Sequence, residues 1–228
     1  MAAAVYDAVV LFGDSLTQMG WNTGGFGAQL ASVYTRKLDV LNRGLSGYNT
    51  KWALPILQKC LAAGPKTRLI VIWFGANDST ILPSIQHVPL DAFIANLKEM
   101  VRLIHEADSS TKIVLMTPPP INDEQRAESR DALAPVDRTF DNTEAYAKAV
   151  AQTGQELGVA VVDVWSAFWR IAGEEQGGLK GYLTDGLHLT SAGYEVVYDA
   201  LLGTIRASLS ELDPEKMVEV FARWETLG

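Results

Sequence analysis

The chain has 228 residues, of which 48% are hydrophobic and 20% are charged, and its formal net charge at pH 7 is −8. This length and composition are typical of one globular domain that can bury a layered core. Because nucleic-acid binding depends on clustered Lys and Arg residues, the acidic balance argues against a nucleic-acid partner.

The cysteine content and the apolar runs bear on compartment and membrane. Cys60 is the single cysteine, so the chain can form no internal disulfide, and nothing in it requires an oxidising compartment. The apolar runs are shorter than the ~20 residues of a spanning helix, and the first residues lack the basic segment of a signal peptide. We therefore expect a cytoplasmic protein without stable membrane insertion, folded as a single domain over residues 1–228.

Five short apolar runs, taken in chain order, predict the strands of one sheet. Their hydrophobic residues are continuous rather than alternating, which is typical of strands buried on both faces of a parallel sheet. The runs are residues 8–12, 38–41, 69–74, 112–116 and 159–164.

Two longer segments carry apolar residues at helical spacing, which predicts amphipathic helices that cover the sheet. The first set is Leu90, Phe93, Ile94, Leu97, Val101 and Ile104, and the second set is Tyr194, Val197, Tyr198, Leu201, Leu202 and Ile205. The alternation of strands and helices predicts a three-layer α/β/α sandwich with a five-stranded parallel sheet, doubly wound and flavodoxin-like.

Capping signals predict where several helices begin. Asp141, with a glutamate three residues later, resembles a capping box, and Thr190 precedes the second amphipathic segment. Asp213, which is followed by a proline, fits the N-cap of a C-terminal helix at about residues 213–227. By contrast, residues 117–140 contain three consecutive prolines and a charged stretch, and they are predicted to form a surface excursion beside the site.

The expected C-terminal helix would carry an apolar stripe of Met217, Val220, Phe221 and Trp224. Such a stripe can fold back on its own domain or pack on a second subunit, which leaves a homodimer open. The first interpretation is favoured because an apolar stripe usually belongs to the core.

Distinctive polar segments follow each of the first three predicted strands. They are residues 13–15, 42–47 and 75–78. In an open parallel sheet, ligands bind beyond the carboxyl ends of the strands. We therefore expect these segments to converge on one edge of the sheet.

Three residues of these segments suit acyl transfer. Ser15 can present its hydroxyl as a nucleophile at the start of a helix, where its own backbone N–H would face a developing oxyanion. Gly44 allows close approach of a backbone N–H, and Asn77 offers an amide NH2 donor. Each also has a simpler interpretation, since serine is a common helix cap, and glycine and asparagine are common in turns.

His188 is the predicted general base, because Asp185 lies three residues before it. A carboxylate on Nδ1–H fixes the tautomer that leaves Nε2 free to accept a proton. His105 lies beside an apolar stripe and is predicted to be structural. His87 lies in a loop, either exposed or near the mouth of the pocket. Dispersed histidines and one cysteine provide no zinc cluster.

Together these segments resemble the four sequence blocks of the SGNH, or GDSL, hydrolase family. The matching residues are Gly13-Asp14-Ser15-Leu16, Gly44, Gly75-Ala76-Asn77-Asp78 and Asp185-Gly186-Leu187-His188. The resemblance implies that Ser15 is the nucleophile, His188 the base and Asp185 the acid that orients it. It also implies an oxyanion hole made by the backbone amides of Ser15 and Gly44 and the side chain of Asn77.

A closer likeness is to the isoamyl-acetate-hydrolysing esterase group within this family, carried by residues 34–37, 42–54, 74–78 and 183–188. This likeness implies hydrolysis of acetate and other short-chain esters of small alcohols, with no metal or organic cofactor and a small-molecule ester as the partner. The alternatives are a thioesterase, a carbohydrate O-deacetylase and a non-catalytic module that binds a small acylated ligand.

Overall fold

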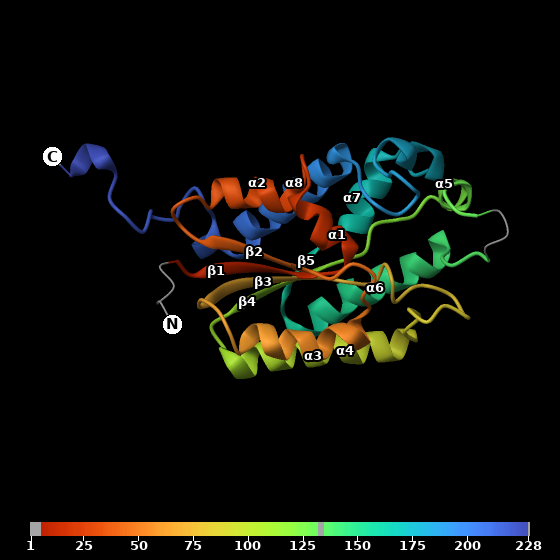
Figure 1. The fold of residues 1–228 in the computed structure, drawn as a ribbon, viewed down its shortest axis with the longest axis horizontal. Helices are drawn as coiled ribbons and strands as arrows, with labels where there is room; N and C mark the ends of the chain where they lie inside the picture. The colour runs from red at the N-terminus through yellow and green to blue at the C-terminus, as the bar shows by residue number, and fades with distance from the viewer. Residues whose placement is uncertain (1–5, 132–134, 228) are drawn as a thin grey trace.

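Five parallel strands form one sheet in the computed structural model, which describes residues 6–131 and 135–227 (Figure 1). The strands are β1 (Ala8–Gly13), β2 (Asp39–Gly44), β3 (Thr67–Trp73), β4 (Lys112–Met116) and β5 (Ala160–Val162). Their spatial order is β2-β1-β3-β4-β5, which confirms the predicted parallel sheet. The connections after β1 and β3 run to opposite faces of the sheet (Figure 1), and such a divergence opens a crevice at the carboxyl ends of the two strands.

Helices cover both faces of the sheet and complete the predicted three-layer sandwich (Figure 1). One face carries α1 (Ser15–Gln18), α2 (Phe26–Val33), α7 (Val164–Ile171) and α8 (Ser191–Ser208), and the other carries α3 (Thr50–Leu61), α4 (Leu90–Ala107) and α6 (Phe140–Leu157). Short 3-10 helices lie at Met19–Trp21, Gln176–Gly181, Ser210–Leu212 and Trp224–Thr226. Within the described ranges, no helix has the length and apolar character needed to cross a membrane.

The position of β1 inside the sheet explains why its sequence is continuously apolar. Successive residues of a strand point to opposite faces, and each face of this sheet meets its own hydrophobic core. Val9 and Leu11 pack with Phe26 in one core, whereas Val10 and Phe12 pack in the other. A central strand between two helical layers therefore has no side facing water.

The helix boundaries follow the predicted caps in part. Thr190 caps α8 as predicted, because its hydroxyl accepts a backbone N–H of the first turn at 3.2 Å. The predicted capping box at Asp141 is wrong, since α6 begins one residue earlier, at Phe140. The hydroxyl of Thr139 accepts the N–H of Asn142 at 3.2 Å, so threonine occupies the cap and Asp141 lies inside the first turn.

The C-terminal segment is not the predicted helix at about residues 213–227. It consists of turns followed by the short 3-10 helix Trp224–Thr226, and it projects from the body of the molecule (Figure 1). The guanidinium of Arg36 donates to two of its carbonyl groups, but Val218 is 86% exposed. A short helix in water needs a buried apolar face. Of the predicted stripe, Met217 packs against the core, whereas Val220, Phe221 and Trp224 are exposed.

The excursion at residues 117–140 contains a short helix, α5 (Asp123–Glu128). Its N-cap is Asn122, whose side chain accepts the N–H of Gln125 at 2.8 Å. No residue of α5 is buried, so local capping and contacts at its flanks stabilise this helix. It lacks the apolar stripe by which a helix is predicted from sequence.

Candidate active site

The side chains of Ser15, His188 and Asp185 form one chain of hydrogen bonds, although the first two are 173 residues apart in sequence. Ser15 Oγ lies 3.0 Å from His188 Nε2, and His188 Nδ1 lies 2.9 Å from Asp185 Oδ2. Ser15 opens α1 directly after β1, while the other two residues precede α8. An alcohol, an imidazole and a carboxylate in this order can make the hydroxyl nucleophilic at neutral pH.

Buried neighbours hold the turn that presents Ser15. Asp14 Oδ1 accepts the N–H of Leu16 at 2.9 Å, and the Tyr194 hydroxyl donates to the carbonyl of Leu16 at 2.8 Å. Burial raises the pKa of Asp14 to about 7, against the opposing effect of the Leu16 hydrogen bond and with a further increase from Asp78. Asp14 Oδ2 is buried and has no hydrogen-bond partner in the described part of the chain, which fits a carboxyl group that carries a proton over part of the neutral range.

The loop that carries His188 folds around the Asp185 carboxylate. Asp185 Oδ1 accepts the backbone N–H groups of Leu187 at 3.1 Å and His188 at 2.7 Å. Gly186 has a φ of +79°, a conformation that glycine adopts without strain. Burial alone would raise the pKa of Asp185, but the hydrogen bonds from His188 and Leu187 outweigh it and hold this pKa well below its usual range.

Asn77, one of the three predicted oxyanion donors, lies in the pocket that also contains Ser15 and His188. Its Nδ2 donates to the carbonyl of Tyr48 at 2.9 Å, and an amide nitrogen has a second hydrogen to offer. The backbone N–H of Ser15 belongs to the first turn of α1 and has no acceptor within the helix. Each group therefore keeps a hydrogen that an oxyanion could accept.

Gly44, the third predicted donor, is arranged differently. It ends β2 opposite Gly13 of β1, but its N–H donates to Asn42 Oδ1 at 2.8 Å. The Asn42 side chain also donates to the carbonyls of Thr17 and Gln18, each at 3.1 Å. Asn42 thus links β2 to α1 and competes with any ligand for the Gly44 amide.

Replacing Gly44 by alanine is expected to lower both thermal stability and ester hydrolysis. A Cβ at this position would overlap the backbone of Thr17 and Gln18, so α1 and Ser15 with it would have to move. Overpacking of this kind costs roughly 1–3 kcal/mol. The measurements are Tm by thermal unfolding and kcat/KM on a short-chain ester.

Gly203→Ala is the matched control for that change. Gly203 lies in α8, and a Cβ there meets no atom within 4 Å. Alanine is favoured over glycine in a helix by roughly 1 kcal/mol, so this variant should keep its activity and unfold at the same or a higher temperature. A Gly44→Ala protein indistinguishable from Gly203→Ala would contradict the close approach of β2 and α1.

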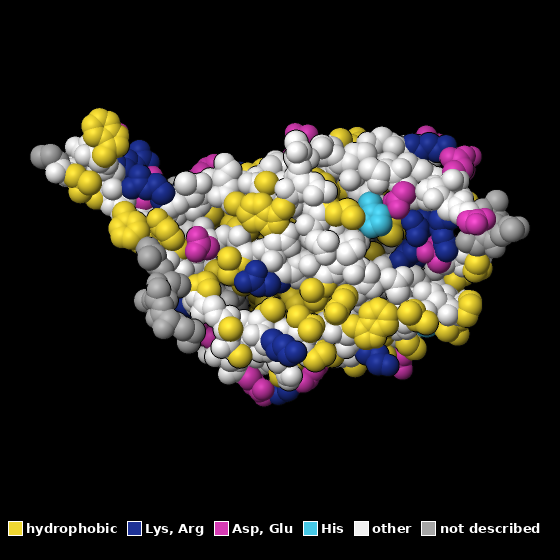
Figure 2. Space-filling view, viewed as in Figure 1, with side chains coloured by type: hydrophobic (Ala, Val, Ile, Leu, Met, Phe, Trp, Pro, Cys, Tyr) yellow, Lys and Arg dark blue, Asp and Glu magenta, His cyan; other side chains and the backbone are white. Residues whose placement is uncertain are grey.

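Ser15, the candidate nucleophile, lines a small pocket of about 230 Å³. Figure 2 shows, on this face, a histidine beside an acidic side chain, with Lys or Arg side chains gathered next to them. The pocket is lined by Ser15, Ser46, Gly47, Asn77, Gln86, Arg126, Asp137, Arg138, Leu187 and His188.

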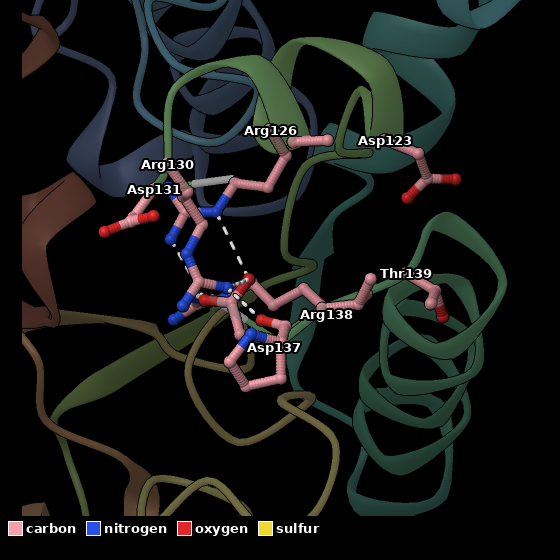
Figure 3. A pocket seen from close by; sticks show the side chains of 10 residues that line it. Asp123, Arg126, Arg130, Asp131, Asp137, Arg138 and Thr139 are labelled. Carbon is pink, nitrogen blue, oxygen red and sulfur yellow. Dashed lines mark hydrogen bonds and ion pairs between the residues drawn. The ribbon is translucent and has the colours of Figure 1, made fainter. Parts of the chain in front are cut away.

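Part of this pocket wall comes from the excursion at residues 117–140, which confirms that the excursion lies beside the site. Arg126, Asp137 and Arg138 contribute to it, and Asp137 Oδ2 lies 3.0 Å from Arg126 Nη2. Arg126 also contacts Asp185 Oδ2 at 3.0 Å. The same three excursion residues help to line a second pocket of about 430 Å³ (Figure 3).

These three residues, and Gln86 with them, are site residues that the sequence did not indicate. Arg126 lies in α5, which has no buried face, and the other three lie in irregular segments without apolar periodicity. Key partners, such as Asp185 for Arg126 and Asn77 for Arg138, are distant in sequence. The one available signal was the density of charge in a stretch that offers little to bury. That signal is weak, because charged stretches usually face solvent.

The remaining histidines lie outside the candidate site. His87 Nδ1 is 2.5 Å from the carbonyl of Thr80, and its neighbour Gln86 lines the pocket instead. The prediction that His105 is structural is wrong, because it is exposed in the last turn of α4, just past the buried Ile104. Among residues 6–131 and 135–227, no cluster of His, Cys, Asp and Glu is suited to hold a metal ion.

The sequence is similar to those of known esterases over most of its length. Residues 11–196 match the GDSL-like lipase/acylhydrolase family. The isoamyl acetate-hydrolyzing esterase 1 homolog of Bos taurus is 40% identical over 215 residues, which cover 91% of this chain and 85% of that protein. A GDSL esterase/lipase of Arabidopsis thaliana is 38% identical over 220 residues, which cover 92% of this chain and 88% of that protein.

Solved structures share the fold at lower sequence identity. A lipase/acylhydrolase from Enterococcus faecalis superposes with a TM-score of 0.68 at 24% identity, covering 95% of this chain and all of its own. A catalytic mutant of an acetylxylan esterase from Geobacillus stearothermophilus gives a TM-score of 0.68 at 21% identity, covering 98% and 99%.

These similarities define a carboxylic ester hydrolase with a three-layer α/β/α fold. The chain belongs to the GDSL-like lipase/acylhydrolase family. A catalytic triad and an oxyanion hole are features of that family. The hydrogen-bonded chain from Ser15 to Asp185 has the form that such a triad requires.

Proposed function

We propose that the protein hydrolyses short-chain carboxylic esters, acetate esters of small alcohols such as isoamyl acetate, through an acyl-enzyme on Ser15. The observation that carries the proposal is the continuous hydrogen bonding from Ser15 Oγ through His188 to Asp185. The choice of substrate is supported by the relatives named isoamyl acetate-hydrolyzing esterase 1 homolog and by the small size of the pocket.

In the first half of the reaction, Ser15 Oγ attacks the ester carbonyl carbon while His188 Nε2 takes the hydroxyl proton. The carbonyl oxygen becomes an oxyanion that the backbone N–H of Ser15 and the side chain of Asn77 stabilise. The carbon–oxygen bond to the alcohol then breaks, and His188 returns its proton to the leaving alcohol. In the second half, His188 deprotonates a water that attacks the acyl-enzyme, and the carboxylic acid leaves as Ser15 regains its proton.

The pocket volume supports a small substrate. Pockets for drug-sized ligands span roughly 300–1,000 Å³, whereas this one is about 230 Å³. Its wall on the excursion side consists of charged side chains that are paired with one another. A long acyl chain would therefore find little apolar surface there, and a short one fits better.

An organophosphonate ester tests the nucleophile directly. Its phosphorus accepts the Ser15 oxygen and loses its leaving group, so intact mass should rise by one phosphonyl group per chain, and peptide mapping should place it on Ser15. Ser15→Ala should remain unlabelled, and Ser46→Ala, which alters another serine of the same pocket, should label normally. A protein that hydrolyses esters but carries the adduct elsewhere would exclude Ser15 as the nucleophile.

A substrate panel tests the ester class. We expect kcat/KM to be highest for acetate esters of small alcohols and to fall as the acyl chain lengthens from two to about eight carbons. Acyl-thioesters and acetylated xylooligosaccharides belong in the same panel. A preference for either of these, by roughly tenfold or more, would replace the proposed substrate class and leave the nucleophile unchanged.

A further inference from the structure

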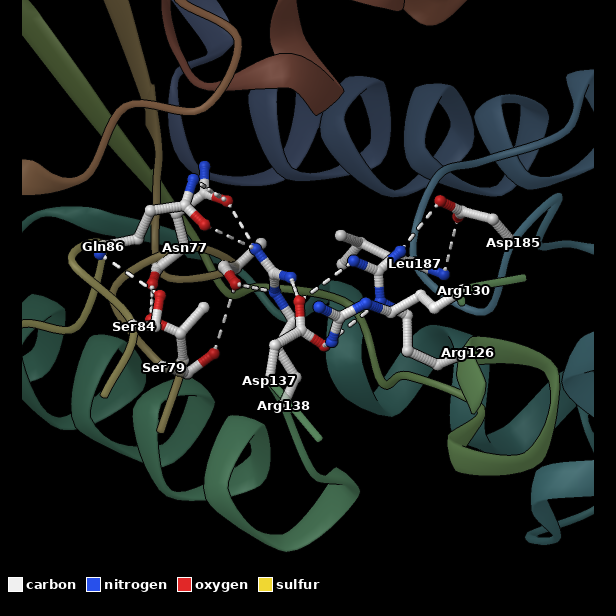
Figure 4. A network of polar contacts seen from close by, with 12 residues as sticks. Asn77, Ser79, Ser84, Gln86, Arg126, Arg130, Asp137, Arg138, Asp185 and Leu187 are labelled. Carbon is white, nitrogen blue, oxygen red and sulfur yellow. Dashed lines mark hydrogen bonds and ion pairs between the residues drawn. The ribbon is translucent and has the colours of Figure 1, made fainter. Parts of the chain in front are cut away.

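Arg138 is a buried cation that contacts Asn77, a candidate oxyanion donor (Figure 4). The residue is only 4% exposed. Its Nη2 donates to Asn77 Oδ1 at 2.8 Å, and its Nε donates to the carbonyl of Ala76 at 2.8 Å. Its Nη1 pairs with the carboxylate of Asp137. The guanidinium is therefore held by three neighbouring groups, and one of these is the Asn77 amide.

These contacts fix which way the Asn77 amide points. A guanidinium has only N–H donors, so the atom that faces Arg138 must be the amide oxygen. Gln86 Nε2 also points at this oxygen, at 3.3 Å, and the amide nitrogen donates to the Tyr48 carbonyl. If the Asn77 amide were rotated by 180°, its NH2 group would face the N–H donors of Arg138 and Gln86, and the hydrogen bonds from both would be lost. The nitrogen is thereby held on the opposite side of the amide from Arg138, next to the Tyr48 carbonyl.

Arg138 also changes the strength of the donor that it orients. A hydrogen bond from a charged group to the amide oxygen draws electron density toward that oxygen, and hydrogen bonds in a chain polarise one another. The remaining Asn77 N–H thus becomes a better donor to a negative charge. This benefit is largest when the ester carbonyl becomes an oxyanion, so it belongs to the transition state more than to the bound ester.

We infer that Arg138 is a positioning residue of the ester hydrolysis, which acts by orienting and polarising the Asn77 amide of the oxyanion hole. The inference rests on the proposed function, because it assigns Asn77 a role in the reaction. It goes beyond the motifs of the sequence, because Arg138 lies in the excursion, outside all four blocks that match the family.

A double-mutant cycle between the two residues tests this inference. Asn77→Ala alone should lower kcat by about 10²–10³-fold. Arg138→Met, which removes every donor, should lower kcat by about 10–10²-fold with a change in KM of less than about threefold. The combined variant should be no slower than Asn77→Ala, within about threefold, because Arg138 acts through an amide that is already gone.

Two further variants complete the experiment. Arg130→Met is the matched control, since Arg130 contacts the same Asp137 carboxylate at 2.7 Å but has no bond to Asn77, and its kcat should stay within about twofold. Arg138→Lys keeps a buried cation and should lose less activity than Arg138→Met. Should Arg138→Met fail to fold, the cycle is run with Arg138→Lys, whose loss should also vanish in the Asn77→Ala background.

The outcomes separate this inference from the proposed function. If losses at Arg138 and Asn77 multiply, Arg138 acts on the fold of the site rather than on the amide, and the inference is wrong while the esterase proposal stands. If Asn77→Ala keeps its activity within a few-fold, Asn77 is no oxyanion donor, and both the proposed hole and the inference fail. Phosphonate labelling of Ser15 reports on the nucleophile independently of both results.

Discussion

Replacing Ser15 or His188 by alanine should lower kcat for ester hydrolysis by about 10⁴–10⁶-fold. Ser15→Ala removes the atom that would carry the acyl group. His188→Ala removes the base 3.0 Å from that atom, and a serine hydroxyl without a base is a weak nucleophile at neutral pH. These are the largest effects expected of any single change in this protein.

The combined variant distinguishes a working unit from two separate contributions. Residues that act in one step are strongly non-additive, so Ser15→Ala with His188→Ala should be about as slow as either change alone. Matched controls are Ser208→Ala at the exposed end of α8 and His105→Ala on the exposed side of α4, both with kcat near that of the parent. Near-normal turnover by Ser15→Ala or His188→Ala would exclude the proposed mechanism.

Asp185→Asn should lower kcat by about 10³–10⁴-fold. The carboxylate accepts the Nδ1–H of His188 and so leaves Nε2 free as the base. An asparagine can keep one oxygen on the backbone N–H groups of Leu187 and His188, but it then presents an NH2 group to His188 Nδ1. The imidazole would adopt the other tautomer, with its hydrogen on Nε2, and could no longer take the proton of Ser15.

The same substitution should alter stability in a pH-dependent way. The folded-state pKa of Asp185 lies below its usual value, so its ionised form contributes stability above pH ~4, and this contribution is lost as the pH falls toward the lower folded-state pKa. The denaturation midpoint of Asp185→Asn should therefore lie below that of the parent at pH 7, with a smaller difference at pH 3. Asp199→Asn, at an exposed position of α8, is the control. A midpoint difference that does not depend on pH would contradict this account.

The sequence contained enough to predict the layers of the fold and the residue types of the candidate triad. Continuous apolar runs such as residues 69–74 mark strands buried on both faces, because burial by two helical layers requires apolar residues at every position. Ser15 lies where a buried strand ends. Asp185 and His188 lie close together in the chain, so their mutual geometry is largely local.

Contacts between distant segments settled what the sequence left open. The orientation of Asn77 depends on Arg138, which is 61 residues away. The Asn42 side chain, which engages the Gly44 amide within β2, also donates to the carbonyls of Thr17 and Gln18 in α1. The predicted C-terminal helix shows the same limit, because its apolar spacing specifies a helix only if a surface exists to cover it.

The amino-acid sequence by itself determined the five buried strands, the two amphipathic helices and the chemical groups that are available, because burial leaves periodic patterns in the chain. The tertiary structure alone decided that Ser15 and His188 lie 3.0 Å apart and that a buried guanidinium backs the Asn77 amide. Hydrogen bonds between side chains depend on ångström-scale placement of segments far apart in the chain, and residue spacing does not encode that placement.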